Sequence, residues 1–194
     1  MSRATFYFDL GSPYAWLAAE RISGLFADAG LEQPEWQPIL LGGLFQRFGR
    51  DSWANGPGRA EGIAEVERRA AAYGLPPLAW PEPWPGNTLL AMRAATFAKQ
   101  TGRCVSFALA AFRQAFAAGR DLSEADNVLI AAAACELHPN AMIKAVQTEA
   151  VKGALREATD RAAELGVIGV PSIAVGEEVF WGDDRVEEAV AAAS

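Results

Sequence analysis

The sequence predicts an α/β fold in which a helical insertion separates a β-α-β half from a β-β-α half. Three observations support this prediction. A strand, a helix and a second strand pattern follow one another over residues 4–43, Ala-rich helical patterns fill the middle of the chain, and two short strand patterns and a helix end it. With 194 residues, the chain is long enough for one domain with a sizeable core.

The first half begins with a strand over residues 4–10. Phe6, Phe8 and Leu10 share one face of this strand, and its aromatic residues favour a strand covered on both sides. A helix is expected from Pro13, and Gly30 is a typical residue to end it. Residues 35–43 then form a second strand, reached by a right-handed crossover.

The middle of the chain combines two irregular loops with helices. The loops cover residues 50–62 and 74–87, which are rich in Gly and Pro. Helical patterns cover residues 61–73, 87–101, 105–118, 123–136 and 141–165, with a possible break near Gly153.

The last segment returns to strands. Residues 170–175 and 179–182 flank Gly176-Glu177, and a glycine at the first position of a two-residue loop favours a type II′ hairpin. The final helix begins with acidic residues, which a helix N-terminus favours. This order is that of a thioredoxin-like fold, with residues 1–45 and 166–194 in the thioredoxin-like domain and 46–165 in the loops and helical insertion.

Composition narrows the class of function. The net charge is −7 without a basic cluster, which argues against nucleic-acid binding. No signal peptide or membrane-spanning run is present in the sequence. Cys104 and Cys135 form no Cys-x-x-Cys motif and are expected to be buried thiols in a reducing compartment, the cytoplasm. His138 is the single histidine, so no histidine-based metal site is expected.

The junction between the first strand and the first helix carries the most informative residue, Ser12. Ser12-Pro13 is a common helix start, which is one explanation of the pair. Disulfide exchange at this loop is excluded because Ser12 and Ala15 stand where a dithiol enzyme needs cysteines. A serine nucleophile lacks a neighbouring base, since His138 lies in the distant helical segment.

The third possibility is that Ser12 donates a hydrogen bond to a thiolate that a ligand brings. Lowering a thiol pKa by about 2 units requires about 2.7 kcal/mol. A hydrogen bond to a charged acceptor supplies about 1.5–3 kcal/mol, and a helix N-terminus adds about 0.3–1 kcal/mol. Together these contributions suffice without a histidine.

Five stretches resemble the 2-hydroxychromene-2-carboxylate isomerases, which are close to the kappa-class glutathione transferases and to the periplasmic disulfide oxidoreductases. They are FYFDLGSPYAWLA, PILLGGLF, GNTLLAMRA, LGVIGVPSIAV and VFWGDDRVEEA, in the same order over nearly the whole chain. The resemblance implies a thioredoxin fold with a helical insertion, usually dimeric, that uses glutathione as cofactor.

The resemblance also implies site residues. Ser12 falls on the serine that faces the glutathione sulfur, and Val170 precedes the cis-proline, where its backbone can pair with the glutathione peptide. Asp183 and Asp184 fall where the family binds the γ-glutamyl end, with a helix cap as the alternative explanation. Asn55 resembles a glutathione-binding residue.

Other residues are candidates for contacts with the substrate. Asn87 resembles a residue of the substrate pocket, and a helix N-cap explains it equally well. Three tryptophans are candidate cavity walls, with a place in the core as the alternative, namely Trp80, Trp84 and Trp181. Relatives often carry lysines that this chain lacks, and three arginines are candidate replacements to meet a carboxylate: Arg47, Arg50 and Arg59.

The implied activity is glutathione-dependent cis–trans isomerisation of 2-hydroxychromene-2-carboxylate to trans-o-hydroxybenzylidenepyruvate, or of a similar small aromatic carboxylate from aromatic degradation. The bound thiolate adds reversibly to the conjugated side chain of the ring-opened form, which turns the double bond into a single bond. That bond rotates, and the thiolate leaves. One alternative is a kappa-like glutathione transferase or peroxidase. Another is a non-catalytic thioredoxin-fold module that binds glutathione.

Overall fold

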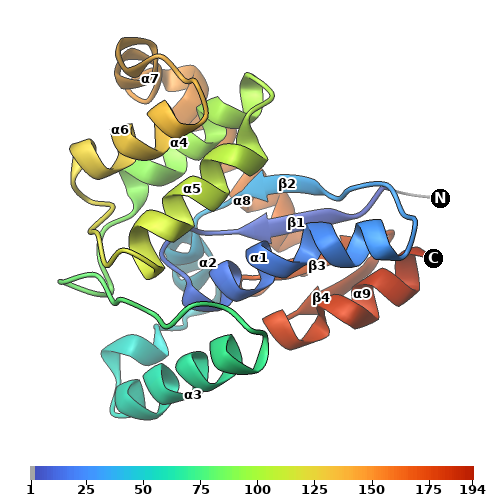
Figure 1. Cartoon of the computed structure of the whole chain (residues 1–194). Coiled ribbons are helices and arrows are strands. Elements are labelled where there is room, and N and C mark those ends of the chain that lie inside the picture. The colour runs from blue at the N-terminus through green and yellow to red at the C-terminus, as the bar shows by residue number, and fades with distance from the viewer. Residues whose placement is uncertain (1–2) are drawn as a thin grey trace.

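The computed structural model describes residues 3–194 and is built on a four-stranded sheet in the order β2-β1-β3-β4 (Figure 1). Strand β1 (Thr5–Phe8) pairs in parallel with β2 (Glu35–Pro38) and antiparallel with β3 (Ser172–Val175). Strand β3 pairs antiparallel with β4 (Glu178–Trp181). Because β1 lies between β2 and β3, it joins the two ends of the chain in one sheet. The predicted thioredoxin-like α/β fold is confirmed.

Aromatic residues of β1 form the centre of the core. Phe6 and Phe8 are fully buried, and the Phe6 ring meets Trp36 of β2 edge-on with ring centroids 4.8 Å apart. Such edge-to-face pairs add to the hydrophobic gain from burial. Helices α1 (Pro13–Asp28) and α9 (Val186–Ala193) lie in front of the sheet in Figure 1, and α8 (Glu149–Glu164) lies behind it.

Helix α1 starts as its sequence predicts. The Ser12 side chain accepts the N–H of Ala15 at 3.2 Å, and Pro13 occupies the first helical turn. Gly30 follows the helix with φ +69°. The hairpin is also confirmed, because Gly176 has φ +63° and joins β3 to β4 in a two-residue loop.

The second strand is shorter than predicted. It ends at Pro38, and residues expected to extend it form helix α2 (Leu41–Phe48). The N–H groups at the start of α2 bind distant side chains, since Leu40 donates to Thr159 Oγ1 at 3.0 Å and Leu41 donates to Asp9 Oδ2 at 2.8 Å. These partners stabilise a helix N-terminus that the local sequence does not cap.

The middle of the chain is helical, as predicted. It contains a short 3₁₀ turn (Trp53–Asn55) and helices α3 (Arg59–Ala72), α4 (Leu89–Gln100), α5 (Cys104–Phe116), α6 (Ala125–Ala134) and α7 (Pro139–Ala145). Helices α4 to α7 lie together at one side of the sheet, whereas α3 lies apart from them (Figure 1).

For the predicted helix over residues 141–165, the predicted position of the break, near Gly153, is wrong. This segment is two helices, α7 and α8, separated after Ala145, and Gly153 lies inside α8. Thr148 caps α8 by accepting the N–H of Val151 at 3.3 Å, which fixes the start of that helix.

Three further findings concern the two cysteines, membrane spanning and metal binding. Cys104 and Cys135 are buried and free, as predicted. Within residues 3–194, no helix combines the length and apolarity needed to cross a bilayer. The same residues contain no group of three or more His, Cys, Asp or Glu side chains placed to hold a metal ion.

Candidate active site

A cavity of about 530 Å³ opens where the loop after β1 meets the turn before β3. This volume lies in the range of about 300–1,000 Å³ that is usual for small-molecule sites. Residues from seven parts of the chain line it, namely 9 and 11–14, 41, 42 and 45, 50–53 and 55, Arg69, 84–86 and 88, 169–171, and 181–184. Residues from both ends of the chain therefore meet the helical segment at one site.

Ser12 lines this cavity and is 4% exposed. Its hydroxyl oxygen caps α1, and its hydroxyl group lies 3.5 Å from the carbonyl oxygen of Val170. A donor–acceptor distance of 3.5 Å is long for an O–H···O bond, so this acceptor holds the proton weakly. The hydroxyl is thus able to turn to a better acceptor in the cavity.

The segment before β3 lines the cavity with backbone groups. The Val170–Pro171 peptide is cis, as the resemblance implied. The N–H of Val170 has no acceptor among residues 3–194, and it lies in a wall of the cavity. An extended ligand therefore has a backbone donor available beside Ser12.

Three separate elements bind successive parts of this segment. Arg50 Nη1 donates to the carbonyl of Ile168 at 2.9 Å, Ser12 faces the carbonyl of Val170, and the N–H of Gly182 donates to the carbonyl of Pro171 at 3.0 Å. Along residues 168–171, the contacts therefore come first from the Arg50 cation, then from the Ser12 hydroxyl and last from the acidic turn that begins at Gly182.

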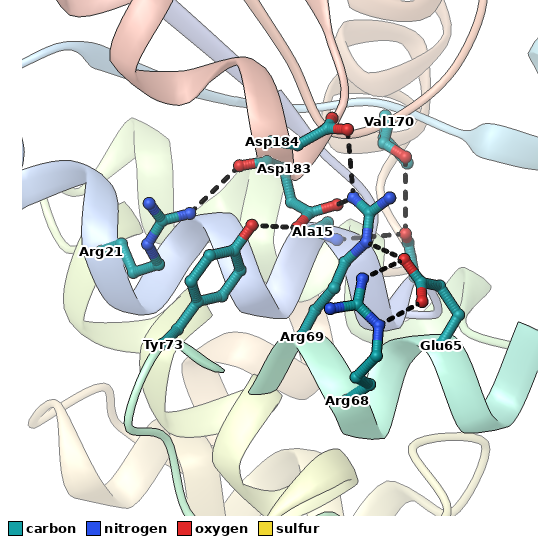
Figure 2. Close-up of polar contacts among 10 residues, drawn as sticks. Ala15, Arg21, Glu65, Arg68, Arg69, Tyr73, Val170, Asp183 and Asp184 are labelled. Carbon is teal, nitrogen blue, oxygen red and sulfur yellow. Dashed lines mark hydrogen bonds and ion pairs between the residues drawn. The ribbon is translucent and has the colours of Figure 1, made fainter. Parts of the chain in front are cut away.

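The Asp183 carboxylate is held by hydrogen bonds from other side chains of the protein (Figure 2). Its side chain is 1% exposed, and its two carboxylate oxygens accept from Arg69 Nη1 at 2.8 Å and from the Tyr73 hydroxyl at 2.9 Å. Burial raises the pKa of Asp183 and, with the nearby Asp183 charge, raises the pKa of Tyr73 to about 12. The Asp183 carboxylate therefore joins α3 to the turn before α9.

Asp184 is the accessible member of the acidic pair. Its side chain is 57% exposed and its Oδ2 lies 3.3 Å from Arg69. Figure 2 shows it above Arg69, on the side away from Tyr73. The preceding Gly182 has φ +127°, and a Cβ there would lie 2.4 Å from an Asp184 oxygen. Gly182 thus allows the Asp184 carboxylate to lie against the turn.

Of the three arginines considered for an anionic group, only Arg50 lines the cavity. Its guanidinium lies 5.0 Å from the Trp181 ring, and it has no carboxylate partner within residues 3–194. Arg47 instead pairs with Asp160 at 3.5 Å. Arg59 donates to the carbonyl of Ala54 at 3.2 Å. The structure thus selects Arg50 from candidates that the sequence left equivalent.

Aromatic side chains form one wall. The Trp53 ring lies 6.0 Å from Tyr14 and 5.4 Å from Trp84 between centroids. Trp181 stands at the rim and is 42% exposed, so Trp84 and Trp181 line the cavity as considered, whereas Trp80 lies behind Trp84. Trp53 was missed, although it lies two residues before Asn55, which the sequence analysis singled out.

The two asparagines differ in placement. Asn55 lines the cavity and donates from Nδ2 to Asp51 Oδ1 at 3.0 Å. Asn87 does not line it, because its side chain is turned to the start of α4 and accepts the N–H of Leu89 at 3.0 Å. His138 is exposed at the start of α7, away from the cavity lining.

The structure therefore brings together most of the site residues that the sequence singled out. These are Ser12, Asn55, Val170, Trp181, Asp183 and Asp184. It also adds Asp9, a cavity-lining carboxylate only 4% exposed, to which the sequence analysis assigned no role.

The fold and this cavity define a class of protein. A family model described as "DSBA-like thioredoxin domain" matches residues 4–193, and the chain belongs to that family. The sequence is 28% identical over 189 residues to 2-hydroxychromene-2-carboxylate isomerase of Sphingobium xenophagum, covering 94% of this chain and 93% of that protein. The resemblance to these isomerases is thereby confirmed.

Solved structures agree on the fold. A 2-hydroxychromene-2-carboxylate isomerase superposes with a TM-score of 0.88 at 23% identity, covering 98% of this chain and 94% of that one. A probable DsbA oxidoreductase from Streptomyces coelicolor gives 0.74 at 20% identity, covering 98% and 89%. At these identities the likeness shows a shared fold. Ser12 and Ala15 at the start of α1 are not cysteines, and disulfide exchange at this position would need a cysteine pair.

Proposed function

We propose that this protein is a glutathione-dependent cis–trans isomerase that interconverts 2-hydroxychromene-2-carboxylate and trans-o-hydroxybenzylidenepyruvate, or a similar aromatic-degradation intermediate. The observation that carries the proposal is the environment of Ser12. A weakly held hydroxyl, the N-terminus of α1 and the open N–H of Val170 converge on one cavity that contains no cysteine.

The order of groups along residues 168–171 supports glutathione as the cofactor. Asp184 would hold the ammonium group, Ser12 would face the sulfur, and Arg50 would hold the glycyl carboxylate. Asp183 is left out of this set, because both of its carboxylate oxygens already accept hydrogen bonds. The N–H of Val170 would bind the peptide between the two ends.

When bound, glutathione supplies a nucleophilic thiolate for reversible addition to a conjugated double bond. The chain's part is to keep that sulfur ionised. The Ser12 hydroxyl donates to the charged sulfur more favourably than to the Val170 carbonyl at 3.5 Å. The α1 N-terminus favours the same negative charge.

The cavity walls support a flat aromatic substrate. Trp53, Trp84 and Tyr14 line the cavity, and the Trp53 ring lies next to the other two rings. Aromatic stacking and exclusion of water both favour a planar conjugated acid there. This wall is the feature that favours the proposed substrate over small aliphatic electrophiles.

A turnover assay that counts thiols tests the proposal. Purified protein, glutathione and 2-hydroxychromene-2-carboxylate should reach the isomer equilibrium at a rate that saturates with glutathione, while the total free thiol stays constant. Stoichiometric loss of thiol would instead indicate a transferase. Bound glutathione without turnover, and with its thiol pKa near the free value, would indicate a binding module.

A further inference from the structure

Asp9 accepts hydrogen bonds from three different walls of the cavity. Its Oδ1 accepts the N–H of Gly11 at 2.9 Å and the hydroxyl of Thr88 at 3.1 Å. Its Oδ2 accepts the N–H of Leu41 at 2.8 Å. Gly11 precedes Ser12, Leu41 begins α2, and Thr88 precedes α4.

Two of these contacts hold segments that have little other support, namely the start of α2 and the loop before α4. The residue before α2 is Leu40, whose side chain offers no cap, so the α2 N-terminus relies on Asp9 and Thr159. The loop that carries Trp84 is irregular, and two bonds tie it to the residues after β1: Thr88 donates to Asp9 at 3.1 Å, and Trp84 Nε1 donates to the Gly11 carbonyl at a longer 3.4 Å. The backbone carbonyl of Asp9 also accepts the N–H of Ser12 at 3.1 Å.

We propose that Asp9 is a positioning residue, which fixes the Ser12 hydroxyl relative to the α2 wall and the 84–88 loop. The link to Ser12 chemistry rests on the proposed function, whereas the joining of three walls does not. Asp9 does not touch the reacting atoms in this assignment. It acts through Gly11, Leu41 and Thr88.

The chemistry of the site explains why a carboxylate stands there. Three donors point at two oxygens, and no cationic side chain within residues 3–194 pairs with Asp9. An amide would turn its NH₂ group toward at least one of these donors. Burial raises the pKa of Asp9, while the two N–H groups and the Thr88 hydroxyl lower it.

Asp9→Asn is the test, and Thr159→Val is its matched control. Both variants remove an acceptor from the first N–H groups of α2, but Thr159 does not line the cavity. With glutathione bound, ultraviolet titration of the thiolate should show the thiol pKa rising by about one unit in Asp9→Asn, since Ser12 loses its alignment. Thr159→Val should lower the melting temperature and leave that pKa unchanged.

The direction of the shift separates positioning from a charge effect. Removal of a nearby negative charge by itself would lower the thiol pKa, so a fall or no change in Asp9→Asn overturns the proposal. Amide hydrogen exchange without glutathione gives a second readout. Exchange should accelerate in residues 10–16, 40–45 and 86–92 of Asp9→Asn, and only in 40–45 of Thr159→Val.

The exchange readout also separates this inference from the proposed function. If wild-type protein binds no glutathione, the proposed function fails, and exchange alone decides whether Asp9 joins the walls. If Asp9→Asn does not fold, Thr88→Val removes one of the three bonds, and faster exchange confined to 86–92 with a smaller pKa rise is expected. Faster amide exchange in only one of the three segments of Asp9→Asn would contradict the proposal that Asp9 joins all three walls.

Discussion

The hydroxyl of Ser12 lies 3.5 Å from the carbonyl oxygen of Val170, a residue 158 positions further along the chain. This pair joins the start of α1 to the cis-proline turn before β3. The contact is long enough that the hydroxyl gains by exchanging this carbonyl for a charged acceptor.

Ser12→Ala should raise the pKa of the bound glutathione thiol by 1–2 units, because a charge-assisted hydrogen bond of about 1.5–3 kcal/mol is lost. Ultraviolet absorbance of the thiolate measures the shift. The variant should also lose about 0.5–2 kcal/mol of stability, since Ser12 caps α1.

Thr148→Ala is the matched control, because Thr148 caps α8 in the same way and lies outside the cavity lining. It should lose similar stability and leave the thiol pKa unchanged. Equal pKa values in wild type and Ser12→Ala would refute the role of Ser12.

Arg50→Gln should weaken glutathione binding by about 5- to 30-fold, which corresponds to about 1–2 kcal/mol for a partly screened charged contact. The glycyl ester of glutathione provides the decisive comparison. Wild type should prefer glutathione over the ester, and Arg50→Gln should bind both alike. Arg47→Gln, which alters an exposed ion pair with Asp160, should behave as wild type.

Asp183→Asn and Asp184→Asn should separate stability from binding. Asp183 is buried against Arg69 and Tyr73, so its replacement should cost about 1–3 kcal/mol in urea unfolding. Asp184 is half exposed, and its replacement should weaken glutathione binding with little change in stability. The reverse pattern would reassign the ammonium contact to Asp183.

Cys104 should make the fold less stable in alkali. Burial raises its pKa from 9.0 to about 12. A group with a raised pKa in the folded state stabilises fully below its unfolded pKa, and that contribution is lost as pH rises from 9.0 toward about 12. The slope from this group is at most about 1.4 kcal/mol per pH unit.

Cys104→Ser should therefore show a shallower loss of unfolding free energy above pH 9.0 than wild type. In Cys135→Ser, where Cys104 is the remaining thiol, a thiol reagent at neutral pH should react only after unfolding. Rapid modification of the folded variant would show that Cys104 is accessible, contrary to its burial.

Features that depend on neighbouring residues could be predicted from the sequence. The start of α1 at Ser12-Pro13 and the hairpin at Gly176 are set by local hydrogen bonding and backbone freedom. The alternation of Phe6 and Phe8 identified a strand buried in the core. These features made the α/β order and the position of Ser12 predictable.

Features that depend on distant partners could not be predicted. The apolar residues after Pro38 suit a strand equally well, and they form α2 because Asp9 and Thr159 satisfy its first N–H groups. Arg50 was indistinguishable from Arg47 until the fold placed Asp160 beside the latter.

The sequence by itself determined the order of the four strands around a helical middle, the helix start at Ser12 and the absence of a cysteine pair there, since these follow from short-range backbone chemistry and residue identity. Only the tertiary structure decided which side chains share the cavity. It buries Asp183 and leaves Asp184 open, and it makes Asp9 the common acceptor of three walls. Such assignments depend on segments far apart in the chain, whose contacts arise only when the core has packed.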